Sequence, residues 1–95
     1  MLRITLLRES VPPTLKLEGK LSGPWVPELE HSWREIQRHG LVGSVPIDLS
    51  DVSFISSEGK TLLKVMFQQG ANLQSRSLMT RFIINQIKNG SNGSH

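Results

Sequence analysis

Hydrophobic and polar positions follow two different periods along this chain. Apolar residues at every second position predict strands over residues 2–7 and 14–18, a third strand from Val45, and a short edge strand over 71–75. Pro12 and Pro13 break the chain between the first two strands, which we expect to pair as an antiparallel hairpin. The second strand is expected to leave through a loop over residues 19–23.

Apolar residues at helical spacing predict three helices in the intervals between and after these strands. The first helix begins at Pro24, with Ser22 or Gly23 as its cap, and ends near His39 and Gly40. Its apolar stripe consists of Trp25, Leu29, Trp33 and Ile36, and both tryptophans are expected to be buried against the sheet. The second helix begins at Glu58 and ends at Gly70. The third covers residues 78–87 and is apolar on more than one face.

The resulting order is β, β, α, β, α, β, α, in which two helices connect parallel strands by crossovers. It predicts an α/β fold with one mixed β-sheet and with helices packed mainly on one face. We expect a single domain over residues 1–88, followed by a flexible, low-complexity tail over residues 89–95.

Composition narrows the class of protein. The chain has 95 residues, 37% of them hydrophobic and 20% charged, which is typical of one small globular domain. It has no cysteine, so disulfides and thiol catalysis are excluded. No apolar run is long enough to span a bilayer, and the first residues do not resemble a signal peptide. We therefore expect a cytoplasmic protein without direct membrane insertion.

Charge is distributed unevenly along the chain. All eight acidic residues lie at or before Glu58, whereas residues 59–95 contain five basic residues and no acidic one. Such asymmetry is typical either of a docking face for an acidic partner or of a solvated helix surface. The basic residues are not interleaved with aromatic ones, so the pattern does not favour a nucleic acid as partner.

The junction between the third strand and the second helix carries the most distinctive polar residues. Ser56 and Ser57 lie where a helix N-terminus leaves backbone N–H groups without partners. Two interpretations follow: the hydroxyls cap the helix, or the helix end holds a phosphate. Glu58 complements the same helix end and would repel a phosphate on Ser57.

Four segments in order carry a family resemblance: LKLEGKL at residues 15–21, IDLSDVSFI at 47–55, SSEG at 56–59 and GANL at 70–73. Over about residues 13–88 the chain resembles the STAS domain of bacterial anti-sigma factor antagonists. In that family the loop commonly reads Asp-Ser-Ser-Gly, and its first serine accepts phosphate from a partner anti-sigma kinase. The resemblance places the acceptor at Ser57. Where the family usually has the aspartate and the second serine of this loop, the chain has Ser56 and Glu58. Where the family usually has an acidic residue after the second strand, the chain has Ser22.

The resemblance implies a regulatory protein-interaction module whose partner is an anti-sigma factor or a similar serine kinase. The alternative is a constitutive accessory subunit of a lipid-transport ATPase, without a phosphate switch. Either role would use the same face, made of Ser22, Gly23, Ser56, Ser57, Glu58, Lys60 and Lys64. Two further roles are compatible with the sequence: homodimerisation through the apolar third helix, and sensing of a small molecule.

Catalytic and metal-binding patterns are absent from the sequence. His31, His39 and His95 have no metal-ligand spacing and are interpreted as surface residues. Asp48 and Asp51 are interpreted as turn and strand-end residues. Because Ser57 has no evident general base, we expect neither an enzyme nor a bound metal or cofactor.

Overall fold

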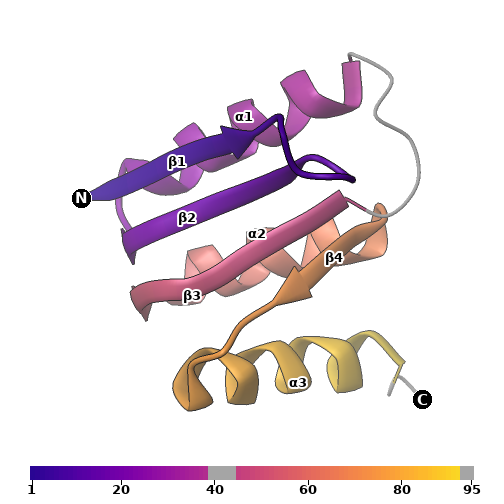
Figure 1. Cartoon of the computed structure of the whole chain (residues 1–95). Helices are drawn as coiled ribbons and strands as arrows, with labels where there is room; N and C mark the ends of the chain where they lie inside the picture. Colours follow the sequence, from indigo (N-terminus) through magenta and orange to yellow (C-terminus); the bar gives the residue numbers. More distant parts are fainter. Residues whose placement is uncertain (39–44, 93–95) are drawn as a thin grey trace.

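Four strands form one mixed sheet in the order β1-β2-β3-β4 (Figure 1). The computed structural model describes residues 1–38 and 45–92. The strands are β1 (Leu2–Leu7), β2 (Thr14–Leu21), β3 (Val45–Ile55) and β4 (Ala71–Gln74). β1 and β2 form the predicted antiparallel hairpin, and β2, β3 and β4 run parallel to one another. The expected mixed sheet is therefore confirmed.

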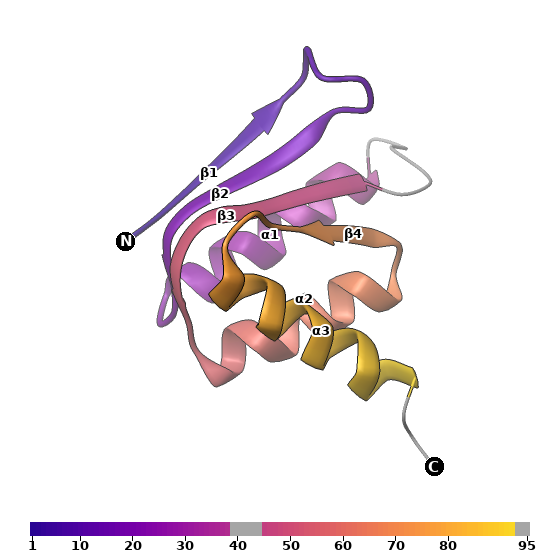
Figure 2. The same cartoon turned by 60° about the horizontal axis from the view of Figure 1, so that its bottom comes forward.

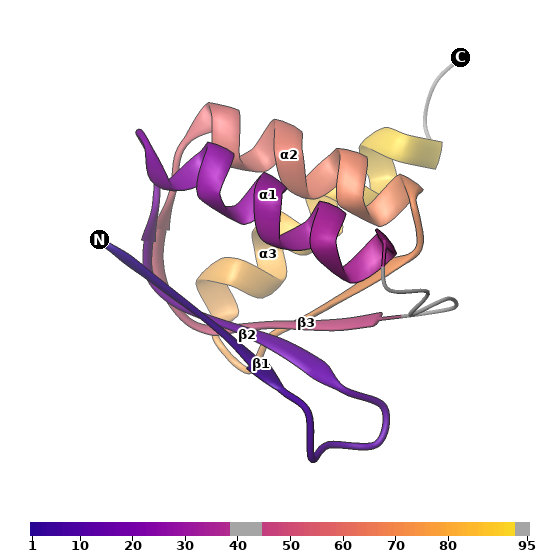
Figure 3. The ribbon, with the colours of Figure 1, turned by 90° about the horizontal axis from the view of Figure 1, so that it is seen from above.

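Three helices cover one side of this sheet, and Figures 2 and 3 show the other side uncovered. They are α1 (Trp25–Arg38), α2 (Ser57–Gln68) and α3 (Leu78–Asn92). α1 connects β2 to β3, and α2 connects β3 to β4, so each joins two parallel strands. The prediction of helices packed mainly on one face is confirmed.

The core lies between the sheet and the helices. Leu17, Ile47, Leu49 and Leu63 are fully buried there, as their alternating or helical positions require. On the uncovered side of the sheet Lys16 and Asp51 form an ion pair with 3.4 Å between Nζ and Oδ2. Because the outer face of the sheet is polar, it can remain in contact with water, and the fold needs no second layer of helices to cover it.

Trp33 connects α1 to the end of α2. Its ring is buried, and its Nε1–H donates to Oε1 of Gln69 over 2.7 Å. Because a buried indole N–H needs an acceptor, this bond fixes α1 beside α2. Trp25 is only half-buried at the start of α1, so the prediction that both tryptophans are buried is correct for Trp33 alone.

Two predicted boundaries differ from the observed ones by three residues or more. β2 extends to Leu21, because residues 19–21 continue the parallel pairing with β3 instead of forming a loop. Gly19 makes this continuation possible with a φ of 105°, at an irregularity of the register. α3 runs past Ile87 to Asn92 and so takes in the first residues of the segment expected to be a tail. The rest of that segment, and the predicted cap at His39 and Gly40, lie outside the described residues.

α3 is apolar on two sides, as its sequence predicts. Ile84 and Ile87 are buried against the rest of the domain. Leu78 and Phe82 are 81% and 63% exposed, and Met79 lies beside them with 44% exposed. The helix therefore packs with one face and leaves an apolar surface at its first turns.

Candidate functional site

The N-terminus of α2 is capped by Ser56. The backbone of this residue is extended, and its Oγ accepts from the N–H of Gly59 over 3.1 Å. Its carbonyl oxygen accepts from the N–H of Lys60 over 2.9 Å, which begins the helical ladder. Of the two serines considered from sequence, Ser56 is thus the N-cap, and its hydroxyl is already engaged.

Ser57 is the first residue of α2, and its side chain is exposed. Its Oγ donates weakly to Oε1 of Glu58, 3.5 Å away, and its carbonyl oxygen accepts from Thr61 Oγ1 over 3.1 Å. The hydroxyl takes no part in the cap. A group attached to it would therefore leave the start of α2 intact.

Ser57 opens a polar stripe along α2. Lys60, Thr61 and Lys64 follow at the third, fourth and seventh positions after it, and these positions share one helix face. Together with α3 the stripe lines a cleft of about 400 Å³. The structure thus brings the predicted residues Ser57, Lys60 and Lys64 into one place.

The α3 side of this cleft was not predicted from the sequence. It is formed by Gln86, Ile87 and Gly90. Lys60 Nζ donates to Oε1 of Gln86 over 3.4 Å, which holds the ammonium group at the cleft. The sequence signal for this side of the cleft is the helical spacing of residues 86, 87 and 90. That spacing predicts a site only when the packing of α3 on α2 is known.

The turn between β2 and α1 lies beside the start of α2. Leu21 and Ile55 pair at the ends of β2 and β3, and the N–H of Ser56 donates to the carbonyl oxygen of Leu21 over 2.9 Å. Ser22 and Gly23 follow immediately, so the structure places them at the same end of the sheet as Ser56. The carboxyl ends of parallel strands are a common place for binding sites in α/β folds.

Ser22 and Gly23 cap α1 through their backbones. The carbonyl oxygens of Ser22 and Gly23 accept from the N–H groups of Trp25 and Val26, each over 3.2 Å. Within the described part of the chain the Ser22 hydroxyl makes no hydrogen bond. Gly23 has a φ of 57°, in the region that favours glycine.

Asp48 and Asp51 lie within β3, because that strand continues to Ile55, so the interpretation as strand-end residues was wrong. Partial burial raises the pKa of Asp48, but hydrogen bonds from Ser50 and the charges of Lys16 and Arg76 outweigh it and lower the pKa below its ordinary value. The Ser50 N–H donates to Asp48 Oδ1 over 2.9 Å. Asp48 is thus held as a carboxylate by structural partners.

Among the described residues, no group of three or more histidine, aspartate or glutamate side chains could hold a metal ion. His31 is exposed on α1, whereas His39 and His95 lie outside the described residues. None of the described helices is long and apolar enough to cross a membrane.

Comparison with known proteins identifies the fold. The structure resembles that of the anti-sigma factor antagonist SpoIIAA in its unphosphorylated form, with a TM-score of 0.66. The match covers 90% of this chain and 82% of SpoIIAA, at 17% sequence identity. The fold is STAS-like. No family model matches the sequence, and no curated protein does.

The STAS-like fold agrees with the resemblance seen in the sequence and confirms the predicted fold class. SpoIIAA is described as an anti-sigma factor antagonist. At this level of identity the likeness concerns the fold, so the roles of single residues rest on the geometry described above.

Proposed function

We propose that this chain is a non-catalytic regulatory module of the cytoplasm that binds a partner protein through the start and the exposed side of α2. The observation that carries the proposal is the cleft in which an exposed Ser57 lies on the same helix face as Lys60 and Lys64. Ser22 and Gly23 extend this surface across the neighbouring turn, and Ser56 and Glu58 complete it. A standard interface needs about 800 Å² on each partner, which a helix face with two loops can supply.

We propose further that phosphorylation of Ser57 modulates this binding. A phosphate there would carry about two negative charges at the positive end of the helix dipole. Lys60 and Lys64 lie on the same face of α2 and would offset its charge. Glu58 opposes it, since its carboxylate lies 3.5 Å from the Ser57 hydroxyl. Lys60 lies three positions after Ser57, a spacing at which helix side chains pair, so its charge would offset that of Glu58.

Mass spectrometry tests this modification. The tagged chain is incubated with ATP and the serine kinase that is recovered with it, in parallel with Ser56→Ala and Ser57→Ala. Ser56→Ala loses the cap but keeps the acceptor, so it and the unchanged chain should gain one phosphate. Ser57→Ala should gain none. An unchanged chain without added phosphate would overturn the switch.

The second candidate is a constitutive accessory subunit of an ATPase complex of the lipid-transport type. Glu58 favours it, because its carboxylate places a permanent negative charge beside Ser57 at the helix end. Co-purification separates the two roles. An ATPase that stays bound with or without nucleotide and kinase supports the accessory subunit. Association that depends on nucleotide, with a kinase-like partner, supports the regulatory module.

Charge reversal tests the surface itself in either role. Lys64→Glu changes an exposed residue of the cleft, and Arg3→Glu makes the same change on β1, at the far edge of the sheet. The partner recovered with the unchanged chain should be lost or strongly reduced with Lys64→Glu and retained with Arg3→Glu. Equal retention by both variants would exclude this face as the interface.

A further inference from the structure

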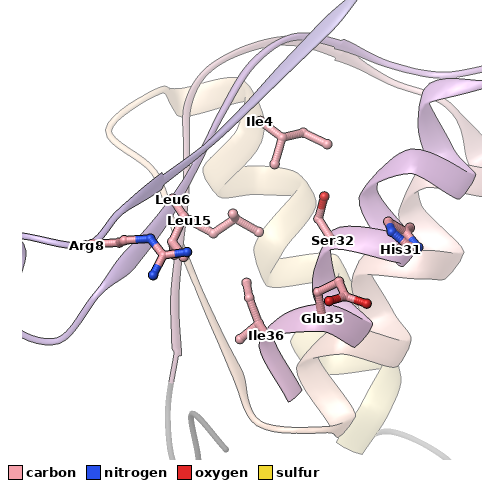
Figure 4. Close-up of a pocket in the computed structure, with 8 residues that line it drawn as sticks. All are labelled: Ile4, Leu6, Arg8, Leu15, His31, Ser32, Glu35 and Ile36. Atoms are coloured by element: carbon pink, nitrogen blue, oxygen red, sulfur yellow. The ribbon is translucent and has the colours of Figure 1, made fainter. Parts of the chain in front are cut away.

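A second cleft lies between the β1–β2 hairpin and α1, and its volume is about 560 Å³. Figure 4 shows the side chains of Ile4, Leu6 and Leu15 facing Ile36 of α1 across it. Volumes of 300–1,000 Å³ with mainly apolar linings are typical of sites for small molecules. This cleft shares no lining residue with the one beside Ser57.

The cleft exists because β1 is only partly covered by α1. Leu2, Ile4 and Leu6 alternate toward the helical layer, but of these three only Leu2 is buried, whereas Ile4 and Leu6 keep part of their surface exposed. Leu15 and Ile36 close the inner end of the cleft and are buried. An apolar ligand would therefore cover surface that the fold itself leaves in contact with water.

The polar side chains that line the cleft are those of Arg8, His31, Ser32 and Glu35. Arg8 lies on the sheet side, and among the described residues its guanidinium group has no ion pair or hydrogen bond. Ser32 lies opposite on α1, and its hydroxyl is likewise without a partner in the described part of the chain. Glu35 also lines the cleft, but its carboxylate forms an ion pair with Arg38 over 3.2 Å. The uncompensated charge at the opening is positive.

We propose that this cleft binds an amphipathic carboxylate with an unbranched acyl chain of medium length. The chain would lie on Ile4, Leu6 and Ile36, and the carboxylate would pair with Arg8. A guanidinium group offers two parallel N–H donors that match the two oxygens of a carboxylate. The Ser32 hydroxyl can donate from the opposite side.

Isothermal titration calorimetry tests this site with decanoate below its micellar concentration. We expect saturable binding of one decanoate per chain. Each methylene group removed should weaken binding by up to about fourfold if the acyl chain is buried, so octanoate should bind several-fold more weakly. Decanol has the same chain without the charge and should bind less tightly than decanoate.

Three variants assign the binding to this cleft. Arg8→Gln should weaken decanoate about tenfold and leave decanol unchanged, because only the carboxylate loses a charged partner. Arg3→Gln removes the same charge from a residue outside the cleft and should change neither ligand. Ser32→Trp fills the cleft from the surface of α1 and should abolish binding of both ligands. Circular dichroism verifies that each variant is folded.

Two results would overturn the proposal. One is the absence of saturable decanoate binding to the unchanged chain. The other is an equal loss of affinity in Arg8→Gln and Arg3→Gln, which would show that decanoate responds to net charge and not to this cleft.

Discussion

Gly59 packs directly against Leu21. A Cβ atom at position 59 would lie 2.9 Å from Cγ and 3.0 Å from the carbonyl oxygen of Leu21, and 3.1 Å from Cγ2 of Ile55. Contacts this short leave no room for a methyl group. The absence of a side chain at Gly59 therefore allows the first turn of α2 to approach the ends of β2 and β3, where the proposed interface lies.

Replacing Gly59 with alanine should destabilise the domain. The added methyl group forces Leu21 or the helix to shift, and overpacking of this kind costs about 1–3 kcal/mol. Gly90 is the matched control, since it is also helical but, among the described residues, has only Lys64 Nζ at 4.0 Å from the added Cβ. Gly90→Ala should stabilise α3 by about 0.5 kcal/mol. Urea unfolding measures both changes, and equal effects of the two substitutions would contradict the close approach.

Ser56→Ala and Ser57→Ala should have different effects on stability. Ser56 accepts from the N–H of Gly59, so its replacement removes the cap at a cost of about 1 kcal/mol. Ser57 is exposed, and within the described part of the chain its Oγ makes only the 3.5 Å contact with Glu58, so its replacement should change the free energy of unfolding little. Thermal and urea unfolding of the two variants compare them. A larger loss in Ser57→Ala would reverse the assignment of the cap.

Local signals were sufficient to predict most of the fold. The alternation over residues 2–7 predicts β1 with its observed bounds, and the serines before Glu58 predict the start of α2. The continuation of β2 through Gly19 could not be predicted in this way. A glycine with positive φ interrupts the regular geometry of a strand, and here the parallel pairing with β3 continues past it.

The candidate site was predictable only in part. Lys60 and Lys64 share a helix face with Ser57, and this follows from spacing alone. The wall formed by Gln86 and the cleft beside Arg8 depend on how α3 and α1 pack, which involves side chains far apart in the sequence. No local period contains that information.

Replacing Gln69 with leucine should destabilise the domain by about 1 kcal/mol. The change removes the acceptor of the Trp33 Nε1–H, and a polar group left without a partner in a part-buried place costs about that much. Gln68→Leu is the matched control, because Gln68 is exposed and makes no side-chain hydrogen bond within the described residues. Urea unfolding gives the free energies, and tryptophan fluorescence should shift only in Gln69→Leu. Equal losses in both variants would show that the bond contributes nothing.

Asp48 should make stability depend on pH. Its pKa is lowered in the folded chain, since the Ser50 hydrogen bonds and the charges of Lys16 and Arg76 outweigh its partial burial. A lowered pKa stabilises the fold above the ordinary value for aspartate, about 3.9, and this contribution is lost as the pH falls through the lower folded value.

Asp48→Asn removes this contribution. The unchanged chain should therefore be more stable than the variant at pH 7. The difference should shrink as the pH falls below about 4, because the carboxylate takes up a proton first in the unfolded chain and then, at lower pH, in the folded chain. Urea unfolding of both proteins at pH 7, 5, 4 and 3 measures the difference. A difference in free energy of unfolding that stays constant or grows toward acidic pH would contradict the prediction. It would mean that the neighbours of Asp48 do not stabilise its carboxylate, because a group with a lowered pKa loses its contribution to stability as the pH falls.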